Sequence, residues 1–284
     1  MHPRPPGTTE WRRLFAAEAG ASRPDLALLC LLIGTEADPS LDEAGIDAAS
    51  RLLDRLAEQA APGHRSRRSD DPRAWASALA ELLGGRCGFK GRPGDYQRLE
   101  SSLLHQVLRR RRGLPILLSV LWMEVARRAG ATVHGVALPG HFVVGFGPLD
   151  DQVLANPFDG GRVLTGTDVE LLVTAATGAP PVPSMLRPAQ PLDIVGRILN
   201  NIRAWAAPRP EHADVSLWAI ELSLLLPSPP PRLHYERAQL LVQSGNFLVG
   251  ARELDTYAEQ IAAEEPATAD QARRQAVRAR AMLN

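Results

Sequence analysis

The feature that most constrains the fold is a long apolar run that follows a basic turn. Residues 109–112 are four consecutive arginines, and Gly113-Leu114-Pro115 follows them. Residues 116–128 are mostly apolar, and Gly130 stands just beyond them. Proline suits the first turn of a helix because its missing N–H would have no helical partner, and glycine suits the position after the last turn. This pattern predicts a buried helix over residues 116–128.

Three short β-type runs come after this helix. They cover residues 132–138, 141–146 and 152–155, and Pro139-Gly140 joins the first two. A turn dipeptide between two apolar runs is typical of antiparallel strands. We therefore expect a helix followed by an antiparallel meander, with His141 opening the second strand and Asn156-Pro157-Phe158 following the third.

Composition narrows the class of protein. The chain has 284 residues, 45% of them hydrophobic and 23% charged, and its formal net charge is zero. Zero net charge does not favour nucleic acid as a partner. The N-terminus lacks the apolar core of a signal peptide, and no run is long enough to cross a bilayer. We expect a cytoplasmic protein without a nucleic-acid or membrane partner. Nearly all basic residues are arginine, which is typical of GC-rich bacterial genomes.

Two cysteines are present, Cys30 and Cys87. Neither belongs to a Cys-x-x-Cys or Cys/His spacing that suggests zinc, and two cysteines do not make a disulfide framework. Cys30 lies inside an apolar run, where a cysteine usually acts as a small buried hydrophobe. We expect no metal and no cofactor.

The rest of the chain favours helices. The pattern predicts an N-terminal helical region over residues 1–94, a core over 95–180, and a linker with further helices over 181–284. The first part includes a Pro/Gly-rich tail at 1–9 and a polar loop at 61–72. The predicted helices outside the core helix cover residues 11–19, 25–34, 41–59, 73–83, 100–112, 166–178, 192–205, 216–226, 233–244, 247–263 and 267–283. Residues 179–191 are rich in proline and predict the linker.

Two of the last helices show the pattern of a tetratricopeptide repeat. Ala238 is the small residue where two helices would touch, and Gly245 with Phe247 would make the tight turn between them. Gly250, Leu254 and Tyr257 follow on one face of the second helix. One such pair needs a neighbour to bury its core.

A thiol protease or transglutaminase needs a cysteine at a helix N-terminus, a histidine to take its proton, and an Asp or Asn to orient the histidine. His141 and Asn156 stand where the base and the orienting residue would be. Pro115 stands at the nucleophile position and cannot act as one. His141 can equally be a strand histidine bonded to structure.

Two other residues could supply a nucleophile. Ser119 lies one turn inside the helix, where a hydroxyl usually bonds back to the helix or sits in the core. Cys87 precedes the core and would have to fold over it, whereas a free cysteine is more often simply buried.

The run from Leu103 through Arg162 (LLHQVLRRRRGLPILLSVLWMEVARRAG, GVALPGHFVV, NPFDGGR) resembles the SirB1 family of transglutaminase-like proteins with a tetratricopeptide tail. The resemblance extends loosely over LLIGTEADPSLD, GFKGRPGDY and the C-terminal repeat. It implies an α+β fold, with a helical N-terminal subdomain, a papain-like core carrying a small antiparallel sheet, and a C-terminal helical repeat. It also implies that proline is usual at the nucleophile position. Ser101-Ser102 replaces the family's Asn-Ser, and Asn156 replaces its Asp, which removes a charge.

We therefore expect a non-catalytic interaction or regulatory module whose protein partner binds the C-terminal helices or the core cleft. The cleft residues would be His141, Asn156 and Pro115. The candidate binding residues are Ser119, Phe142, Phe158 and Asp159. The alternative is a thiol-type hydrolase or acyl transferase that uses His141 with Cys87. A nucleic-acid role for the arginine run is the third and weakest hypothesis.

Overall fold

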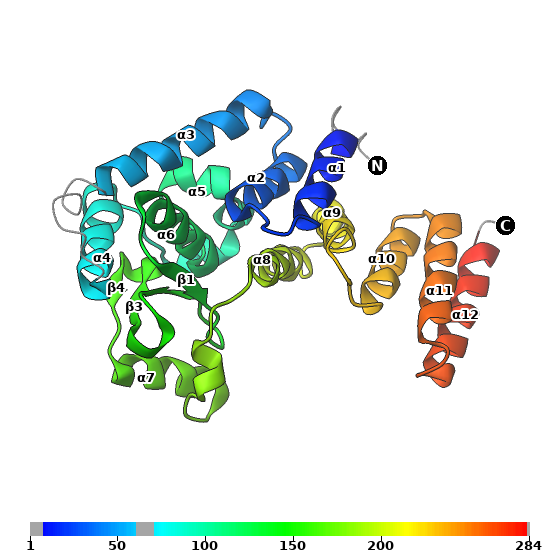
Figure 1. Cartoon of the computed structure of the whole chain (residues 1–284). Coiled ribbons are helices and arrows are strands. Elements are labelled where there is room, and N and C mark those ends of the chain that lie inside the picture. The colour runs from blue at the N-terminus through cyan, green and yellow to red at the C-terminus, as the bar shows by residue number, and fades with distance from the viewer. Residues whose placement is uncertain (1–7, 61–70, 283–284) are drawn as a thin grey trace. The chain divides into compact units, whose positions relative to one another are not determined.

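The structure is a computed structural model that describes residues 8–60 and 71–282. The chain divides into two compact units (Figure 1). One is residues 24–198, and the other combines residues 1–23 with residues 199–284. The predicted tail over residues 1–9 and the predicted loop at 61–72 lie largely outside the described residues.

The first unit contains a four-stranded antiparallel sheet in the order β1-β2-β3-β4. The strands are β1 (Val133–Val136), β2 (Val143–Phe146), β3 (Val153–Asn156) and β4 (Arg162–Val163). The register pairs Val136 with Val143 and Val144 with Ala155. The predicted meander is confirmed, and β4, which has only two residues, is an addition that sequence did not predict.

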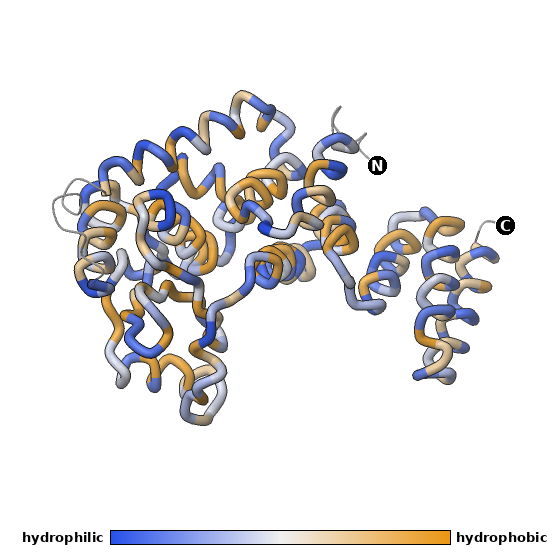
Figure 2. The backbone as a smooth tube through the Cα atoms, viewed as in Figure 1, coloured by the Kyte–Doolittle hydropathy of each residue, from blue (hydrophilic) through white to orange (hydrophobic). Residues whose placement is uncertain are grey.

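The helix α6 (Pro115–Ala129) is the centre of this unit. Twelve of its fifteen residues are buried, and Trp122 is completely inaccessible. Pro115 occupies the first turn, and Gly130 ends the helix in the left-handed conformation with φ of 96°. Burying a leucine or isoleucine side chain stabilises the fold by about 1.5–3 kcal/mol. The helix predicted at residues 116–128 is therefore confirmed as the core helix, and Figure 2 shows its hydrophobic character.

The sheet has helices on both faces. On one face, α6 and α4 pack against β1, β2 and β3. On the other face, α7 (Gly166–Thr177) contributes Val169 and Val173 to a buried cluster with Val136, Val143 and Leu154. The predicted α+β class is confirmed.

The helices of this unit that precede α6 are α2 (Leu26–Ala37), α3 (Glu43–Ala60), α4 (Pro72–Leu79) and α5 (Leu104–Arg110). Asp25 caps α2, because its carboxylate accepts a hydrogen bond from the N–H of Leu28 at 3.0 Å. Figure 2 shows α2 as strongly hydrophobic, whereas α3 alternates between polar and apolar residues.

Two predicted helices in this region were wrong in their extent. The predicted helix 73–83 is α4 followed by a π-helical turn, η1 (Ala80–Arg86), which continues through Gly84-Gly85 instead of ending there. The predicted helix 100–112 begins as a 3-10 turn, η3 (Leu99–Ser102), and only then becomes α5. It ends at Arg111, which adopts φ of 56°. Another 3-10 turn, η2 (Pro93–Gln97), comes before these.

The proline-rich segment 179–190 contacts the core. Its 3-10 turn η6 (Pro183–Leu186) places Met185 and Leu186 against the cluster around Val136. Pro188 bridges to Val136, and the N–H of Ala189 donates to the carbonyl of Gly135 at 2.8 Å. This segment, which composition led us to treat as linker, therefore extends the edge of the sheet beside β1.

The second unit is helical. It contains α1 (Thr8–Ala19), the end of α8 (Pro191–Ala206), α9 (Ala213–Ser223), α10 (Arg232–Gln243), α11 (Phe247–Ile261) and α12 (Pro266–Ala281). This unit also includes the 3-10 turn η7 (Pro210–His212), and two further 3-10 turns of the first unit are η4 (Leu149–Asp151) and η5 (Pro157–Asp159).

The pair α10 and α11 packs closely, as the repeat pattern predicted. A Cβ added at Gly250 would lie 3.0 Å from the carbonyl oxygen of Ala238. Only a glycine lets the two backbones approach this closely without displacing one of them. Leu254, Ala258, Ala272 and Ala276 continue the same buried cluster onto α12.

Gly84 and Gly85 offer a matched test of the packing of η1. A Cβ at Gly84 would lie 1.9 Å from the carbonyl oxygen of Gly160, whereas at Gly85 the nearest atom would be 3.8 Å away. Overpacking costs about 1–3 kcal/mol, so we expect Gly84→Ala to lower the free energy of unfolding by about that amount. Gly85→Ala should leave it unchanged or raise it by up to about 1 kcal/mol. Urea unfolding measures both, and equal stability of the two variants would contradict the packing described.

Asp168 generates a prediction about pH. It forms a capping box at the start of α7, because its Oδ2 accepts from the hydroxyl and the N–H of Thr165 at 2.7 and 2.8 Å. The hydroxyl of Thr165 and then the guanidinium of Arg162 hold the pKa of Asp168 well below its ordinary value. A lowered pKa stabilises the fold above the unfolded value, near 3.8, and this contribution is lost as the pH falls.

We therefore expect Asp168→Asn to unfold at lower urea concentration than the wild type at pH 7. The difference between the two proteins should shrink at pH 3, where the carboxyl of the unfolded chain is largely protonated. A difference that is the same at both pH values would show that the charge of Asp168 does not act this way.

Candidate functional site

The N-terminus of α6 is where a thiol enzyme of this architecture would hold its nucleophile. Pro115 is the first residue of the helix and is buried. The N–H of Leu114, just before it, donates to the carbonyl of Ser101 at 2.9 Å. Ser101, Ser102 and Leu103 are themselves at most 3% exposed. The chain's own segment 101–103 therefore lies against this position.

Ser119 and Phe142 connect α6 to the segment before β2. The hydroxyl of Ser119 donates to the carbonyl of Phe142 at 3.1 Å, and Ser119 is completely buried. Phe142 is 2% exposed, and the guanidinium of Arg197 lies 5.3 Å from its ring centre. Burial lowers the pKa of Arg197. Both candidate binding residues are thus engaged inside the core.

His141 lies two residues before β2, so the prediction that it opens the strand was wrong by this margin. Its N–H donates to the carbonyl of Leu138 at 3.1 Å, which closes the turn at Pro139-Gly140. Its carbonyl accepts from Arg197 at 3.4 Å. Its ring is half-buried, and within the described residues it has no hydrogen-bond or ion-pair partner. Gly140 adopts a left-handed conformation with φ of 69°, so the chain is still turning at His141 and the strand begins only after it.

Asn156 is the last residue of β3. Its side-chain oxygen accepts from the N–H of Phe158 at 3.2 Å, so it stabilises its own turn. Strand alternation sets it on the same face as Leu154, which is the face that α7 covers. No hydrogen bond joins Asn156 to His141 in the described part of the chain. The roles assigned to His141 and Asn156 stay predictions.

Phe158 and Asp159 lie in the turn after Asn156. The ring of Phe158 packs against Tyr96 with 6.0 Å between centres, and its carbonyl accepts from the N–H of Gly91 at 2.9 Å. A Cβ at Gly91 would overlap the ring of Phe158 at 1.9 Å. Asp159 is exposed and pairs with Arg162 at 2.9 Å. The segment between η1 and η2, which contains Gly91, therefore packs onto this turn.

The two cysteines differ in environment. Cys30 is 1% exposed in α2, and burial raises the pKa of its thiol far above the ordinary value. Cys87 is half-exposed and follows η1. It lies in the segment that packs on the turn after Asn156, through the contact of Gly84 with Gly160. The described residues contain no hydrogen bond between Cys87 and His141. They also contain no group of three or more His, Cys, Asp or Glu that could hold a metal.

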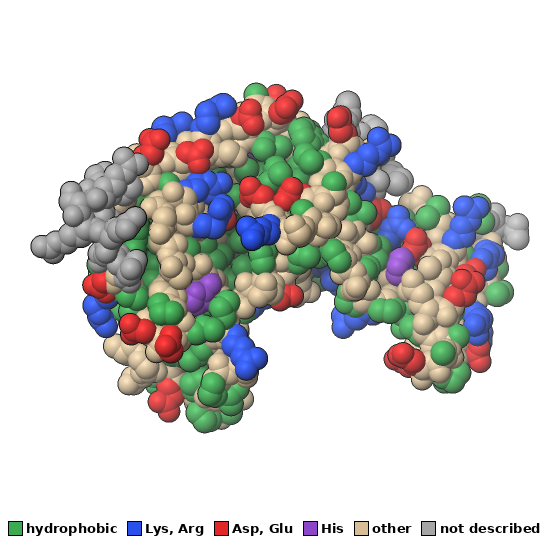
Figure 3. All heavy atoms as spheres, in the orientation of Figure 1, with side chains coloured by type: hydrophobic (Ala, Val, Ile, Leu, Met, Phe, Trp, Pro, Cys, Tyr) green, Lys and Arg blue, Asp and Glu red, His purple; other side chains and the backbone are tan. Residues whose placement is uncertain are grey.

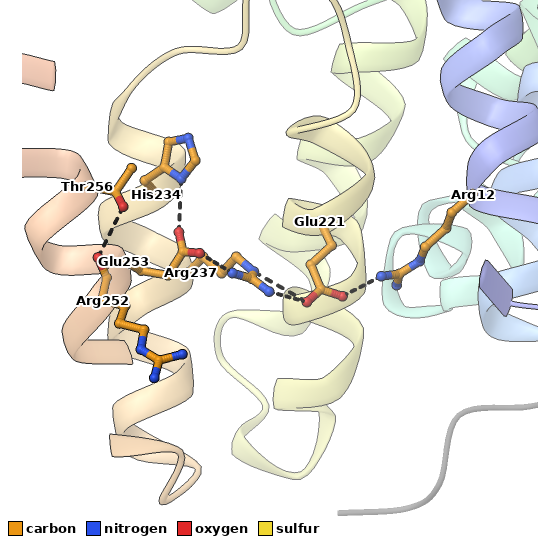
Figure 4. Close-up of polar contacts among 7 residues, drawn as sticks. All are labelled: Arg12, Glu221, His234, Arg237, Arg252, Glu253 and Thr256. Carbon is orange, nitrogen blue, oxygen red and sulfur yellow. Dashed lines mark hydrogen bonds and ion pairs between the residues drawn. The ribbon is translucent and has the colours of Figure 1, made fainter. Parts of the chain in front are cut away.

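The second unit contains an ion-pair chain that sequence analysis missed. Glu221 accepts from Arg12 at 2.7 Å and from Arg237 at 2.9 Å, and Arg237 also pairs with Glu253 (Figure 4). His234 Nδ1 lies 2.9 Å from Glu253. Arg12 is 209 residues from Glu221 in the sequence, so no local pattern predicts the pair. The sequence does contain one indication of the pair, because Glu221 is a charged residue in the apolar run of α9, and a buried charge usually has a partner.

Figure 3 shows basic and acidic side chains interspersed over the visible face of the molecule. This distribution agrees with the zero net charge of the chain. In the described residues, no helix is both long and apolar enough to pass through a membrane.

Known proteins resemble the two parts of the chain. Residues 47–200 match a family described as the transglutaminase-like superfamily, and residues 202–284 match the tetratricopeptide repeat. A UPF0162 protein of Xylella fastidiosa is 31% identical over 237 residues, which cover 80% of each chain. F-box only protein 21 of Mus musculus is 34% identical over 104 residues, 34% of this chain and 17% of that protein.

One solved structure is also similar in part. A crystal structure of menin, described as revealing its binding site for the Mixed Lineage Leukemia protein, aligns with a TM-score of 0.44 at 14% identity. The alignment covers 95% of this chain and 69% of menin. This likeness is too weak to carry an argument.

The cysteines provide a test of these environments. We expect iodoacetamide at neutral pH to alkylate Cys87, which is half-exposed, and to leave Cys30 unmodified, because the reagent cannot reach a buried thiol. Mass spectrometry of digested protein measures both rates, and Cys87→Ser is the control. Labelling of Cys30 in the native protein at the rate of Cys87 would contradict the burial of α2.

Proposed function

Because this chain belongs to the transglutaminase-like superfamily, we propose that it is a non-catalytic member that acts as a protein-interaction or regulatory module. In this proposal the core keeps the arrangement of a thiol enzyme without its reaction. The tetratricopeptide region supplies the surface for the partner.

One observation carries the proposal. The position where a thiol would begin α6 holds Pro115, which has no nucleophilic atom and is buried. Segment 101–103 packs beside it, and the N–H of Leu114 is already bound to Ser101. A nucleophile must be reachable by the substrate and close to its base. Pro115 offers no such atom, and its burial limits access to this helix start.

The C-terminal helices support the second half of the proposal. A cavity of about 330 Å³ lies between α10, α11 and α12. Three glutamines of α10 and α12 line it, Gln239, Gln243 and Gln275, together with Val242 and Met282. A carboxamide both donates and accepts hydrogen bonds, so these side chains suit the backbone of a bound peptide. Tetratricopeptide helices stack to form extended binding surfaces of this kind.

A second candidate function is a thiol-type hydrolase or acyl transferase in which His141 acts with Cys87. It is favoured by the half-exposed thiol of Cys87 and by the packing of η1 on the turn after Asn156. π-helical turns such as η1 occur often at functional sites. The described residues contain no hydrogen bond between Cys87 and His141, which makes this the weaker candidate.

Three further assignments stay predictions within this proposal. They are the SirB1 family name, a cytoplasmic location, and the domain boundaries at residues 94 and 180. Of the proposed binding residues, Asp159 is exposed and Phe158 is half-buried, whereas Ser119 and Phe142 are buried.

An acyl-transfer assay distinguishes the two candidates. We expect the purified full chain to incorporate no fluorescent amine into a glutamine-containing protein and to hydrolyse no activated ester above the blank. His141→Ala and Cys87→Ser should behave like the wild type, because neither residue has a role in turnover. Turnover by the wild type that is lost in either variant, while circular dichroism shows that the variant is folded, would reject the non-catalytic proposal.

A further inference from the structure

A second cavity lies beside the ion-pair chain of the helical unit. It has a volume of about 350 Å³ and is formed by α1, the end of α9 and α10. Its charged lining residues are Arg12, Arg13, Glu221 and Arg237, and its apolar ones include Leu224 and Leu225. Three guanidinium groups therefore face a single carboxylate.

Glu221 holds two of these guanidinium groups in place. It is 8% exposed, and one of its oxygens accepts from Arg12 at 2.7 Å while the other accepts from Arg237 at 2.9 Å (Figure 4). Glu253, which lies outside the cavity lining, forms a second ion pair with Arg237. Among the described lining residues together with Glu253, three guanidinium groups stand beside two carboxylates, next to an apolar wall.

Arg13 is the arginine of this group that is available for a ligand. It is exposed, and within the described part of the chain its side chain has no hydrogen bond and no ion pair. Its guanidinium carries five N–H donors in a planar fork that fits a carboxylate with two parallel hydrogen bonds. Arg12, on the neighbouring position of α1, is held by Glu221 at the same cavity.

We propose that this cavity binds an acidic side chain of a protein partner, with an apolar side chain of the same segment against Leu224 and Leu225. The inference rests on the proposed interaction function and specifies the chemistry of the partner. Charge complementarity favours an anion, and the apolar wall favours a peptide over a free anion. The lining contains no aromatic ring on which a nucleic-acid base could stack.

The test uses the full chain and short fluorescent peptides. One peptide alternates Glu and Leu, a second has Gln in place of every Glu, and a single-stranded RNA of similar length is the third probe. We expect the Glu peptide to bind, with fluorescence anisotropy as the measurement, and its affinity to fall as salt is raised from about 0.05 M to about 0.5 M. The Gln peptide and the RNA should bind at least about tenfold more weakly.

Two charge reversals locate the site. Arg13→Glu should raise the Kd of the Glu peptide about tenfold or more, since a hydrogen-bonded charge pair is replaced by repulsion. Arg274→Glu is the matched control, because Arg274 is also exposed, has no ion pair among the described residues and lies in α12 away from the cavity lining. It should change the Kd less than about twofold. Both positions are exposed, so folding should be preserved, and circular dichroism verifies this.

Several outcomes would overturn the inference. These are no binding of the Glu peptide up to about 1 mM, equal binding of the Gln peptide, tighter binding of the RNA, or equal effects of the two charge reversals. None of them changes the acyl-transfer result, so a failure here is distinguishable from a failure of the non-catalytic proposal.

Discussion

The burial of α6 is the constraint on which the transglutaminase-like unit depends. This helix is covered by the sheet on one side and by α2, α3 and α5 on others, so nearly every one of its side chains is in the core. Glu124, its buried carboxylate, is paired with Arg127 and Arg128 at the end of the helix, where positive charge also suits the helix dipole. Because α6 is buried on most sides, its first turn must lie at a defined position, and Pro115 favours a helix start there.

On the non-catalytic proposal, the same burial allows the architecture of a thiol enzyme to persist without its chemistry. The sheet, the turn before β2 and the end of β3 are all held by packing and hydrogen bonds that a nucleophile does not contribute to. Ser119 bonds to Phe142, and Asn156 bonds to its own turn. Ser119 and Asn156 are thus committed to structural hydrogen bonds, whereas the ring of His141 has no hydrogen-bond or ion-pair partner among the described residues.

Periodicity and turn residues predicted most of the fold. The apolar run of α6, the Pro139-Gly140 turn and the Ala238 contact were visible because each depends on neighbours close in sequence. The π-helical turn η1 was not predicted, because the contact of Gly84 with Gly160 joins segments far apart. The Arg12–Glu221 pair escaped for the same reason. His141 lies in the turn before β2 and not at the start of the strand, and Asn156 is the last residue of β3. The hydrogen-bond partners of both residues depend on a turn geometry that residue types alone do not specify.

The central claim is that the nucleophile position at the start of α6 is closed by the chain itself. Its most direct test is the alkylation rate of Pro115→Cys, in a Cys30→Ser, Cys87→Ser background that keeps the native circular dichroism. The structure predicts that the new thiol reacts only as fast as the protein unfolds, so that its labelling accelerates in urea. Rapid labelling in native buffer, with the pH dependence of a thiolate of lowered pKa, would contradict the claim and would indicate an open, activating site.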